Sequence, residues 1–413
     1  MVGTTIQYFD FFIYALASVL IFPDVFFPGM SDAAATLTAF ASIGVAFVMR
    51  PLGALIFGHF ADRRGRTSVL VVSIALMGVS TFLVGILPGY ATLGFLAPLA
   101  LILLRMAQGI ALGGEGMGAT ILAVEYAPPR KRGLYSAFPG VGASLGALLA
   151  HLSFLSLTAL LGEDRFASWG WRIPFLAGAV LVVISLWIRL SVAESPVFAA
   201  VHARERALRV PLAEVLRRQP ATLALAIAAL LVGNVLYFVT QTFALSYGTT
   251  VLDVPDAVML RAALISLAVQ AVTGFLAAAF SDRLGRRRVC VTGAVLCGLW
   301  AVPLIWLLRT GEPALITVAF ALSMLVYAVY SGPLGAYLAG LFTTRYRFTA
   351  VALAFNTGVM AGGALAPAAA DRLIAATGSV WAVSGLVAGA ALISLAALAR
   401  LTERHPDDLG ADG

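Results

Sequence analysis

One short motif occurs twice in this chain, at corresponding places in two similar halves. The residues D-R-R-G-R at 62–66 recur 220 positions later as D-R-L-G-R at 282–286. Each copy joins two long apolar segments. Self-similarity at about half the chain length, with the repeated loop between apolar segments, predicts two equivalent bundles of membrane helices.

The composition supports a membrane fold. Of the 413 residues, 61% are hydrophobic and only 11% are charged, which excludes an ordinary soluble surface. Apolar stretches long enough to cross a hydrocarbon core of roughly 30 Å predict an all-α membrane protein. We expect twelve transmembrane helices, six per half, near residues 4–28, 36–58, 68–88, 98–126, 132–160, 172–192, 219–247, 258–280, 289–308, 313–341, 349–372 and 379–401.

The longest polar interval before the tail divides the chain into domains. We expect an N-terminal six-helix bundle at 1–193, a cytoplasmic linker at 194–218, a C-terminal six-helix bundle at 219–402 and a cytoplasmic tail at 403–413. The mixed charge of the linker fits either an amphipathic segment on the membrane surface or a solvated connection.

The basic residues indicate the orientation in the membrane. Twenty of the 27 Lys and Arg residues fall in alternate loops and the C-terminal tail, so the positive-inside rule predicts that both termini are cytoplasmic. We expect a multi-pass protein of the cell inner (plasma) membrane. The first apolar segment has no preceding basic region or cleavage site and should remain as a helix. The net charge of +7 fits contact with lipid, and we expect no nucleic-acid partner.

Ionisable side chains inside the membrane usually mark a pathway, because burying them in hydrocarbon is costly. In the first helix Asp10 shares one face with Gln7 and Tyr14, at spacings of three and four residues. In the fourth helix a second polar face contains Arg105, Gln108 and Glu115.

Two acids near an arginine suit proton coupling, because the pKa of a carboxylate changes when its charged partner or its contact with water changes. Asp10, Glu115 and Arg105 are therefore candidate proton-coupling residues. A structural ion pair that bridges two helices remains an alternative. Glu125 and Arg50 lie nearer the predicted cytoplasmic helix ends, and we interpret them as interfacial anchors.

The second half offers mainly neutral polar side chains, which could hold the oxygens of a solute or could bond between helices. Together with the N-terminal faces they make up the candidate substrate-binding set, which comprises Arg105, Gln108, Tyr14, Gln7, Asn234, Tyr237, Gln241, Tyr327, Tyr330 and Asn356.

The sequence contains no zinc-type Cys/His spacing, phosphate-binding GK[ST] loop or G-x-S-x-G turn. We therefore expect neither an enzyme nor a bound cofactor. The only sizeable cytoplasmic interval is too short for a nucleotide-binding domain, so an ion gradient or the solute gradient must supply the energy.

Several motifs in register resemble the major facilitator superfamily and, within it, the metabolite:proton symporter family. The loop GHFADRRGR (58–66) resembles the superfamily's signature, and RMAQG (105–109) its fourth-helix motif. The blocks YFDFFIYA (8–15), RPLGALIFGH (50–59), GGE (113–115), WGWRIPF (169–175) and ESPVF (194–198) resemble the narrower family. The resemblance implies proton-coupled uptake of small metabolites, either organic acids such as shikimate, citrate or oxoglutarate, or zwitterionic osmolytes such as proline and betaine.

The resemblance also implies that the repeated loops act in gating. There the two aspartates would cap or pair with neighbouring helix ends, and the arginines would brace the closed inner gate. The expected gating residues are Asp62, Arg63, Gly65, Arg66, Asp282, Arg283, Gly285 and Arg286.

The chain departs from the family pattern at two positions. Gln7 and Gly340 stand where the family usually has glutamate, so coupling would depend on Asp10 and Glu115, and uncoupled facilitation stays open. Our hypothesis is proton symport of a small organic anion by a monomer embedded in the lipid bilayer. The alternatives are a drug or metabolite:proton antiporter, a facilitator and a transport-dead metabolite sensor.

Overall fold

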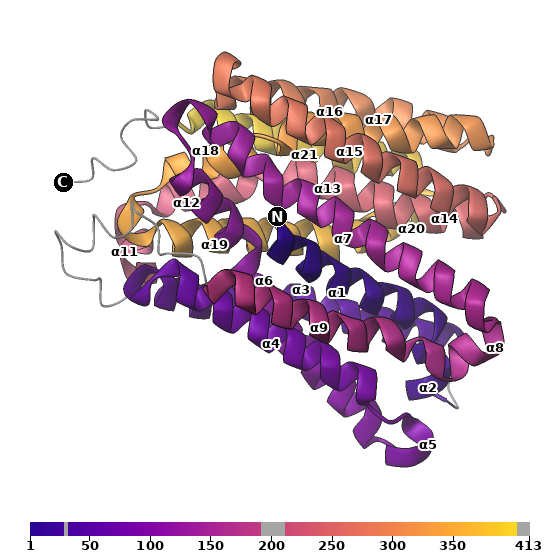
Figure 1. The fold of residues 1–413 in the computed structure, drawn as a ribbon. Helices are drawn as coiled ribbons and strands as arrows, with labels where there is room; N and C mark the ends of the chain where they lie inside the picture. The colour runs from indigo at the N-terminus through magenta and orange to yellow at the C-terminus, as the bar shows by residue number, and fades with distance from the viewer. Residues whose placement is uncertain (29–31, 191–210, 403–413) are drawn as a thin grey trace.

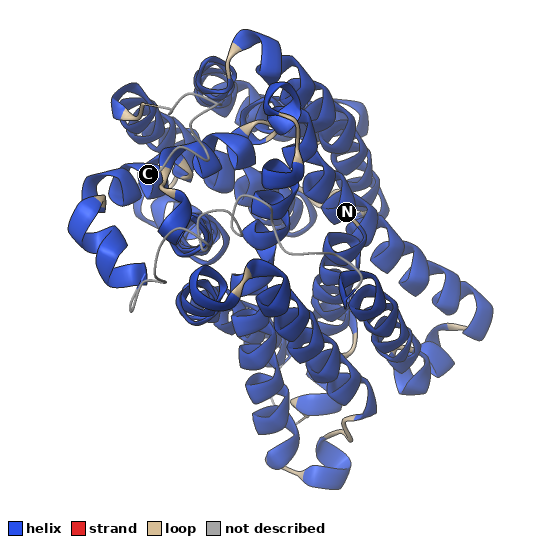
Figure 2. Ribbon diagram, turned by 60° about the vertical axis from the view of Figure 1, so that its left-hand side comes forward, coloured by secondary structure: helices blue, strands red, loops and turns tan. Residues whose placement is uncertain are grey.

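The computed structural model describes residues 1–28, 32–190 and 211–402, and these form helices joined by short loops, without a strand among them. The helices run side by side along one common direction (Figure 1), and Figure 2 shows that nearly the whole described chain is helical. A helix satisfies its backbone hydrogen bonds internally, as crossing a membrane requires.

The first half contributes six long helices. The long helices are α1 (Val2–Leu20), α3 (Asp32–Arg64), α4 (Arg66–Ile86), α6 (Leu96–Tyr126), α7 (Arg132–Leu161) and α9 (Arg172–Leu190). Short elements connect them: α2 (Phe22–Phe26), α5 (Tyr90–Leu93), η1 (Pro129–Lys131), α8 (Glu163–Arg165) and the π-helical η2 (Phe166–Gly170).

The second half contributes six spans, three of which are segmented. The segmented spans are α12 (Pro220–Ala229) with α13 (Leu231–Phe238), η3 (Val239–Ala244) and α14 (Leu245–Thr250); α17 (Pro313–Ser331) with α18 (Leu334–Leu341); and α19 (Arg347–Met360) with η5 (Ala361–Leu365) and α20 (Ala366–Thr377). The continuous helices are α15 (Asp256–Leu284), α16 (Arg286–Leu308) and α21 (Trp381–Arg400), and the 3-10 turn η4 (Thr344–Tyr346) precedes α19.

The twelve spans agree with those that the sequence predicts. Within the described ranges, nine helices are individually long and apolar enough to cross a membrane, or ten if the bent pair α8–η2 and α9 counts as one span. Three predicted spans, 36–58, 258–280 and 349–372, end too early. The helices α3 and α15 continue through the aspartate and arginine of the repeated motif to residues 64 and 284, and α20 continues to Thr377.

Glycine ends both of these helices. Gly65 has φ 111° and Gly285 has φ 92°, a region that side chains disfavour. At each site one helix stops, the backbone turns sharply, and the next helix starts with Arg66 or Arg286. The motif therefore makes a tight turn between consecutive membrane helices.

Small residues let the helices of each half approach closely. A Cβ atom built on Gly113 of α6 would lie 2.2 Å from the carbonyl oxygen of Arg50 on α3, and one built on Gly146 of α7 would lie 2.3 Å from that of Thr5 on α1. Such contacts require hydrogen in place of a side chain. Tight packing is thus the structural reason for these two glycines.

The two halves meet mainly along α3 with α19 and along α7 with α15. The helix α11 (Pro211–Arg218) contacts both α3 and α19 and buries Val215 completely. It lies at the end of the bundle that carries the loops at Gly65 and Gly285 and the starts of α7 and α19, which we call the arginine-rich end (left in Figure 1). Of the predicted linker, only 211–218 falls within the described residues, and the tail 403–413 lies outside them.

Candidate functional site

A hydrogen-bonded chain connects three helices inside the first half. Arg105 Nη1 on α6 donates to Gln108 Oε1 at 3.1 Å, and Gln108 Nε2 donates to Thr81 Oγ1 on α4 at 2.8 Å. The Thr81 hydroxyl then donates to Asp10 Oδ2 on α1 at 3.1 Å. Every donor is directed toward the carboxylate, so neighbouring bonds polarise one another. Arg105 is thereby linked to Asp10 without a direct ion pair.

Aromatic rings surround the Arg105 side chain, which is 1% exposed. Its guanidinium carbon lies 4.0 Å from the ring centroid of Tyr14 and 5.2 Å from that of Phe11. The Tyr14 hydroxyl is in turn hydrogen bonded to the Ser42 hydroxyl at 2.8 Å. Ring faces attract a cation and replace part of its lost hydration. The predicted residue Tyr14 therefore positions Arg105.

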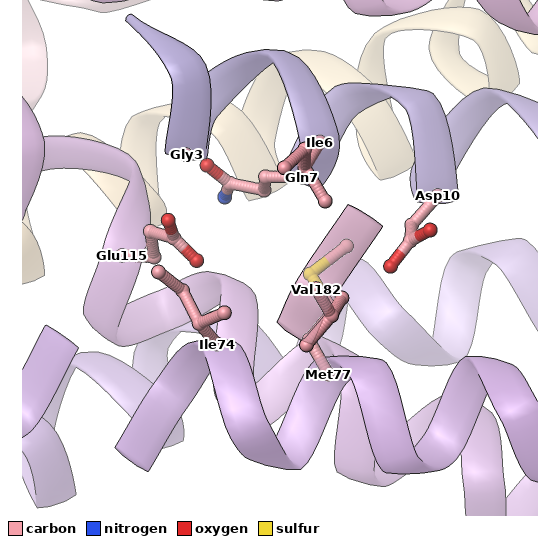
Figure 3. Close-up of a pocket in the computed structure, with 8 residues that line it drawn as sticks. All are labelled: Gly3, Ile6, Gln7, Asp10, Ile74, Met77, Glu115 and Val182. Atoms are coloured by element: carbon pink, nitrogen blue, oxygen red, sulfur yellow. The ribbon is translucent and has the colours of Figure 1, made fainter. Parts of the chain in front are cut away.

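A small pocket between α1, α4, α6 and α9 contains both acids. It is lined by Gly3, Ile6, Gln7, Asp10, Ile74, Met77, Glu115 and Val182, and has a volume of about 10 Å³. Figure 3 shows the Gln7 and Glu115 side chains pointing toward one another across the pocket, with Asp10 at its other end. This volume accommodates about one water molecule and is too small for a metabolite.

Gly178 of α9 makes room for Asp10. A Cβ atom at this position would lie 2.8 Å from Asp10 Oδ1. Asp10 itself is fully buried. The position of this carboxylate thus depends on a residue from a fourth helix that carries no chemistry of its own.

The polar residues predicted in the second half divide into two groups, of which the first lies near α1. Tyr237 and Tyr327 are half-buried, and their ring centroids are 5.3 Å apart. Both lie near Tyr8 of the first half. Nearby in sequence, Gln241 lies in the π-helical turn η3 and donates to the Ser266 hydroxyl at 2.9 Å.

The second group bonds to backbone carbonyls. Asn234 Nδ2 donates to Leu230 at 2.9 Å, and the Tyr330 hydroxyl donates to Ala229 at 2.5 Å, both within the second half. Asn356 Nδ2 instead crosses between the halves and donates to the Gly113 carbonyl at 3.0 Å. Such bonds are typical of packing between membrane helices, the alternative that the sequence left open for these residues.

Asp62 connects the halves at the arginine-rich end. Its carboxylate, at the end of α3, accepts hydrogen bonds from the backbone N–H groups of Phe348 and Thr349 at 3.3 and 2.9 Å. It also accepts one from the Thr349 hydroxyl at 2.7 Å. These donors form the first turn of α19, where a helix N-terminus favours negative charge. We call this contact the first latch.

Asp282 makes the corresponding contact in the opposite direction. At the end of α15 it accepts hydrogen bonds from the backbone N–H groups of Gly133 and Leu134 at 2.7 and 2.9 Å, in the first turn of α7. Arg286 Nη2 lies 3.4 Å from the same carboxylate. This second latch is the pseudo-symmetric partner of the first, so each half caps a helix of the other.

A buried ion-pair network reinforces the first latch. Glu125, the penultimate residue of α6, pairs with Arg66 of its own half and with Arg347 of the other half, the latter at 3.0 Å. All three side chains are at most 1% exposed. Arg66 Nη2 also donates to the Thr344 carbonyl at 3.3 Å. Gly340 is the penultimate residue of α18, so the second half has no carboxylate at the corresponding position.

The other motif arginines lie outside these contacts. Arg63 and Arg283 are exposed at the arginine-rich end, and Arg63 Nη1 is 3.1 Å from His59 Nε2 of its own helix. Of the predicted gating arginines, the structure therefore buries Arg66 and Arg286 and leaves the two others in solvent.

The interpretation of Arg50 as an interfacial anchor is wrong. Arg50 lies 14 residues before the end of α3, about 20 Å from that end at ~1.5 Å per residue, and its side chain is 7% exposed. Its guanidinium carbon lies 5.0 Å from the Phe47 ring centroid. The error arose because α3 is longer at this end than its apolar stretch indicates. The sequence did contain the relevant signal, namely an arginine within an apolar segment.

Other residues of the site could not be identified from the sequence alone. Thr81 and Gly178 are ordinary residues of apolar helices, and only the packing of α1, α4 and α9 brings them to Asp10. Arg347 could be placed in a loop from the sequence, but its partner Glu125 is 222 residues away.

Comparison with known proteins shows the family. The model of the Major Facilitator Superfamily matches residues 1–367. The inner membrane metabolite transport protein YhjE of Escherichia coli (strain K12) is 40% identical over 411 residues, which cover 97% of this chain and 90% of that protein. The shikimate transporter of the same organism is 34% identical, covering 96% of this chain and 92% of the transporter.

Further similarities agree with this. The proline/betaine transporter of Salmonella typhimurium is 33% identical, and the alignment covers 90% of this chain and 76% of that transporter. Among solved structures, the proton:xylose symporter XylE has the same fold, with a TM-score of 0.80 at 16% identity, covering 99% of this chain and 96% of that one. Since these matches extend along nearly the whole sequence, the chain belongs to the major facilitator superfamily and is a twelve-helix membrane transporter, not an enzyme.

Proposed function

We propose that this transporter takes up a small organic anion together with protons, by alternating access of a site between its two halves. The observation that carries the proposal is the hydrogen-bonded chain from Arg105 through Gln108 and Thr81 to Asp10. It links a buried cation to a buried acid inside one six-helix bundle.

The chain couples anion binding to protonation. Arg105 Nε and Nη2 have no hydrogen-bond partner in the described structure, so a substrate carboxylate would supply one. A second negative charge on nearby Asp10 is then less favourable, and the bound anion promotes protonation of Asp10. By thermodynamic reciprocity, protonation equally promotes binding of the anion.

The water-sized pocket supports a proton site separate from the substrate site. It contains Asp10 and Glu115, either of which can hold a proton, together with Gln7, which cannot. In this proposal no cofactor takes part, and the proton gradient supplies the energy for accumulation.

The gating proposal follows from the two latches. We infer that the arginine-rich end faces the cytoplasm, because positive loops are retained there, and that both termini lie on that side. The name of the relative YhjE supports the inner membrane as the location. The latches would hold this end closed in one state and separate when the halves rock apart, in a protein that works as a monomer.

The test uses proteoliposomes with a pH-sensitive dye in the lumen and no imposed proton gradient. Shikimate, citrate, oxoglutarate or betaine is added outside, and the expected result is acidification of the lumen by at least one compound. Asp10→Asn should abolish the acidification but retain exchange of labelled substrate for unlabelled. Asp256→Asn, which changes an exposed aspartate in the first turn of α15, is the matched control and should behave as wild type.

Other outcomes would change the assignment. Solute entry without acidification would indicate an uncoupled facilitator. Acidification that persists in Asp10→Asn and in Glu115→Gln would refute the proton role of these acids. The absence of any response would favour efflux or a sensor, which the sensitivity of cells to toxic compounds and saturable binding without flux would separate.

A further inference from the structure

Arg50 is a second buried cation next to Arg105. The guanidinium carbons of Arg50 and Arg105 lie 5.6 and 5.2 Å from the ring centroid of the same residue, Phe11. The first also lies over Phe47 and the second over Tyr14. Two arginines from α3 and α6 therefore gather around one ring of α1, deep within the first half.

Neither arginine is ion-paired with a carboxylate in the described part of the chain. Arg105 makes a single hydrogen bond, to Gln108, and Nε of each arginine lacks a partner. Asp10 is held by Thr81 instead. Ring faces compensate a buried charge only in part, so two neighbouring cations without a counter-ion are unfavourable until an anion binds.

Arg50 also lies next to a contact between the two halves. The ring of Phe47, on which its guanidinium lies, makes an edge-to-face contact with Phe238 of the second half at 5.5 Å. Tyr8 of α1 lies near Arg50 and also near Tyr237 and Tyr327 across the interface. An alternating-access transporter binds its substrate at such an interface near the membrane midplane.

We propose that the substrate carries two negatively charged groups, as a dicarboxylate does, with Arg105 binding one group and Arg50 the other. A substrate with a single carboxylate would leave one buried cation uncompensated. Arg50 is then the residue that selects dianions over monoanions and zwitterions. This inference rests on the proposed function, since it names the substrate class of the same site.

The experiment measures ligand-induced thermal stabilisation of the purified full-length transporter in detergent. Succinate and glutarate are each compared with the monoamide in which one carboxylate is replaced, succinamate and glutaramate, and with shikimate and betaine. We expect a dicarboxylate to bind about tenfold to a hundredfold more tightly than its monoamide, the range for a hydrogen bond to a charged group. Arg50→Gln should reduce this ratio to near one, whereas Arg50→Lys, which keeps the charge, should retain most of it.

The inference is overturned if shikimate or betaine binds more tightly than every dicarboxylate, or if no dicarboxylate binds. It is also overturned if Arg50→Gln weakens the binding of the dicarboxylate and the binding of its monoamide equally. If Arg50→Gln does not fold, the affinity of the wild-type protein for a dicarboxylate relative to its monoamide decides alone whether the dianion proposal holds. If the ratio is as expected but the liposomes never acidify, the dianion site stands and the proposed proton symport fails, so the two failures are distinguishable.

Discussion

Removing the charge of Asp62 should open the arginine-rich end. The carboxylate accepts three hydrogen bonds from the first turn of α19, two on one oxygen and one on the other. In Asp62→Asn the amide group replaces one acceptor by a donor and removes the charge at the helix N-terminus. Such interactions contribute about 1 to 2 kcal/mol. The open population should therefore rise about fivefold to thirtyfold.

A single cysteine reports this population. Ser136 is 7% exposed, and its hydroxyl lies 3.4 Å from the Gly332 carbonyl of the other half, so the residue should become accessible when the halves separate. The native cysteines, Cys290 and Cys297, are completely buried and are replaced by serine. In Ser136→Cys protein the rate of maleimide labelling then measures how often this end is open.

Asp256→Asn removes an exposed aspartate from a first helical turn at the opposite end and should leave the labelling rate unchanged. Asp282→Asn, which breaks the pseudo-symmetric latch, should raise it to a similar extent. If Asp62→Asn labels no faster than the parent, the first latch does not contribute to closure and the gating argument fails.

Three further changes test other contacts. Gly178→Ala places a Cβ atom 2.8 Å from Asp10 Oδ1 and should displace this carboxylate. Substrate-driven acidification of liposomes should be abolished, while the melting temperature stays near that of the wild type. Normal acidification would contradict the role of Gly178 in positioning Asp10. Glu125→Gln removes the buried carboxylate that pairs with both Arg66 and Arg347, and it should destabilise the protein by roughly 3 kcal/mol. The loss should appear as a lower melting temperature in detergent, and an unchanged melting temperature would contradict it. Gly58→Val adds a Cβ atom that would lie 2.8 Å from the Cα atom of Thr349 in the other half. The added side chain should push the halves apart, so maleimide labelling of the Ser136→Cys reporter should become faster. An unchanged labelling rate would contradict the close approach.

Much of the fold follows from the sequence. The apolar segments predicted the twelve spans, and the repeated motif predicted their division into two halves, because membrane burial acts on each segment locally. Spacings of three and four residues placed Gln7 with Asp10 and Arg105 with Gln108 on common helix faces. These are properties of single helices, which a sequence displays directly.

Tertiary structure decided which faces meet. The sequence could not connect Gln108 to Thr81 or exclude a direct pair between Asp10 and Arg105, because these contacts depend on how α1, α4 and α6 are rotated and displaced. The two latches and the pair between Glu125 and Arg347 likewise join residues more than 140 positions apart. The length of each apolar stretch determines that its helix crosses the membrane, whereas the partners of its few polar atoms are set by close packing among all twelve helices.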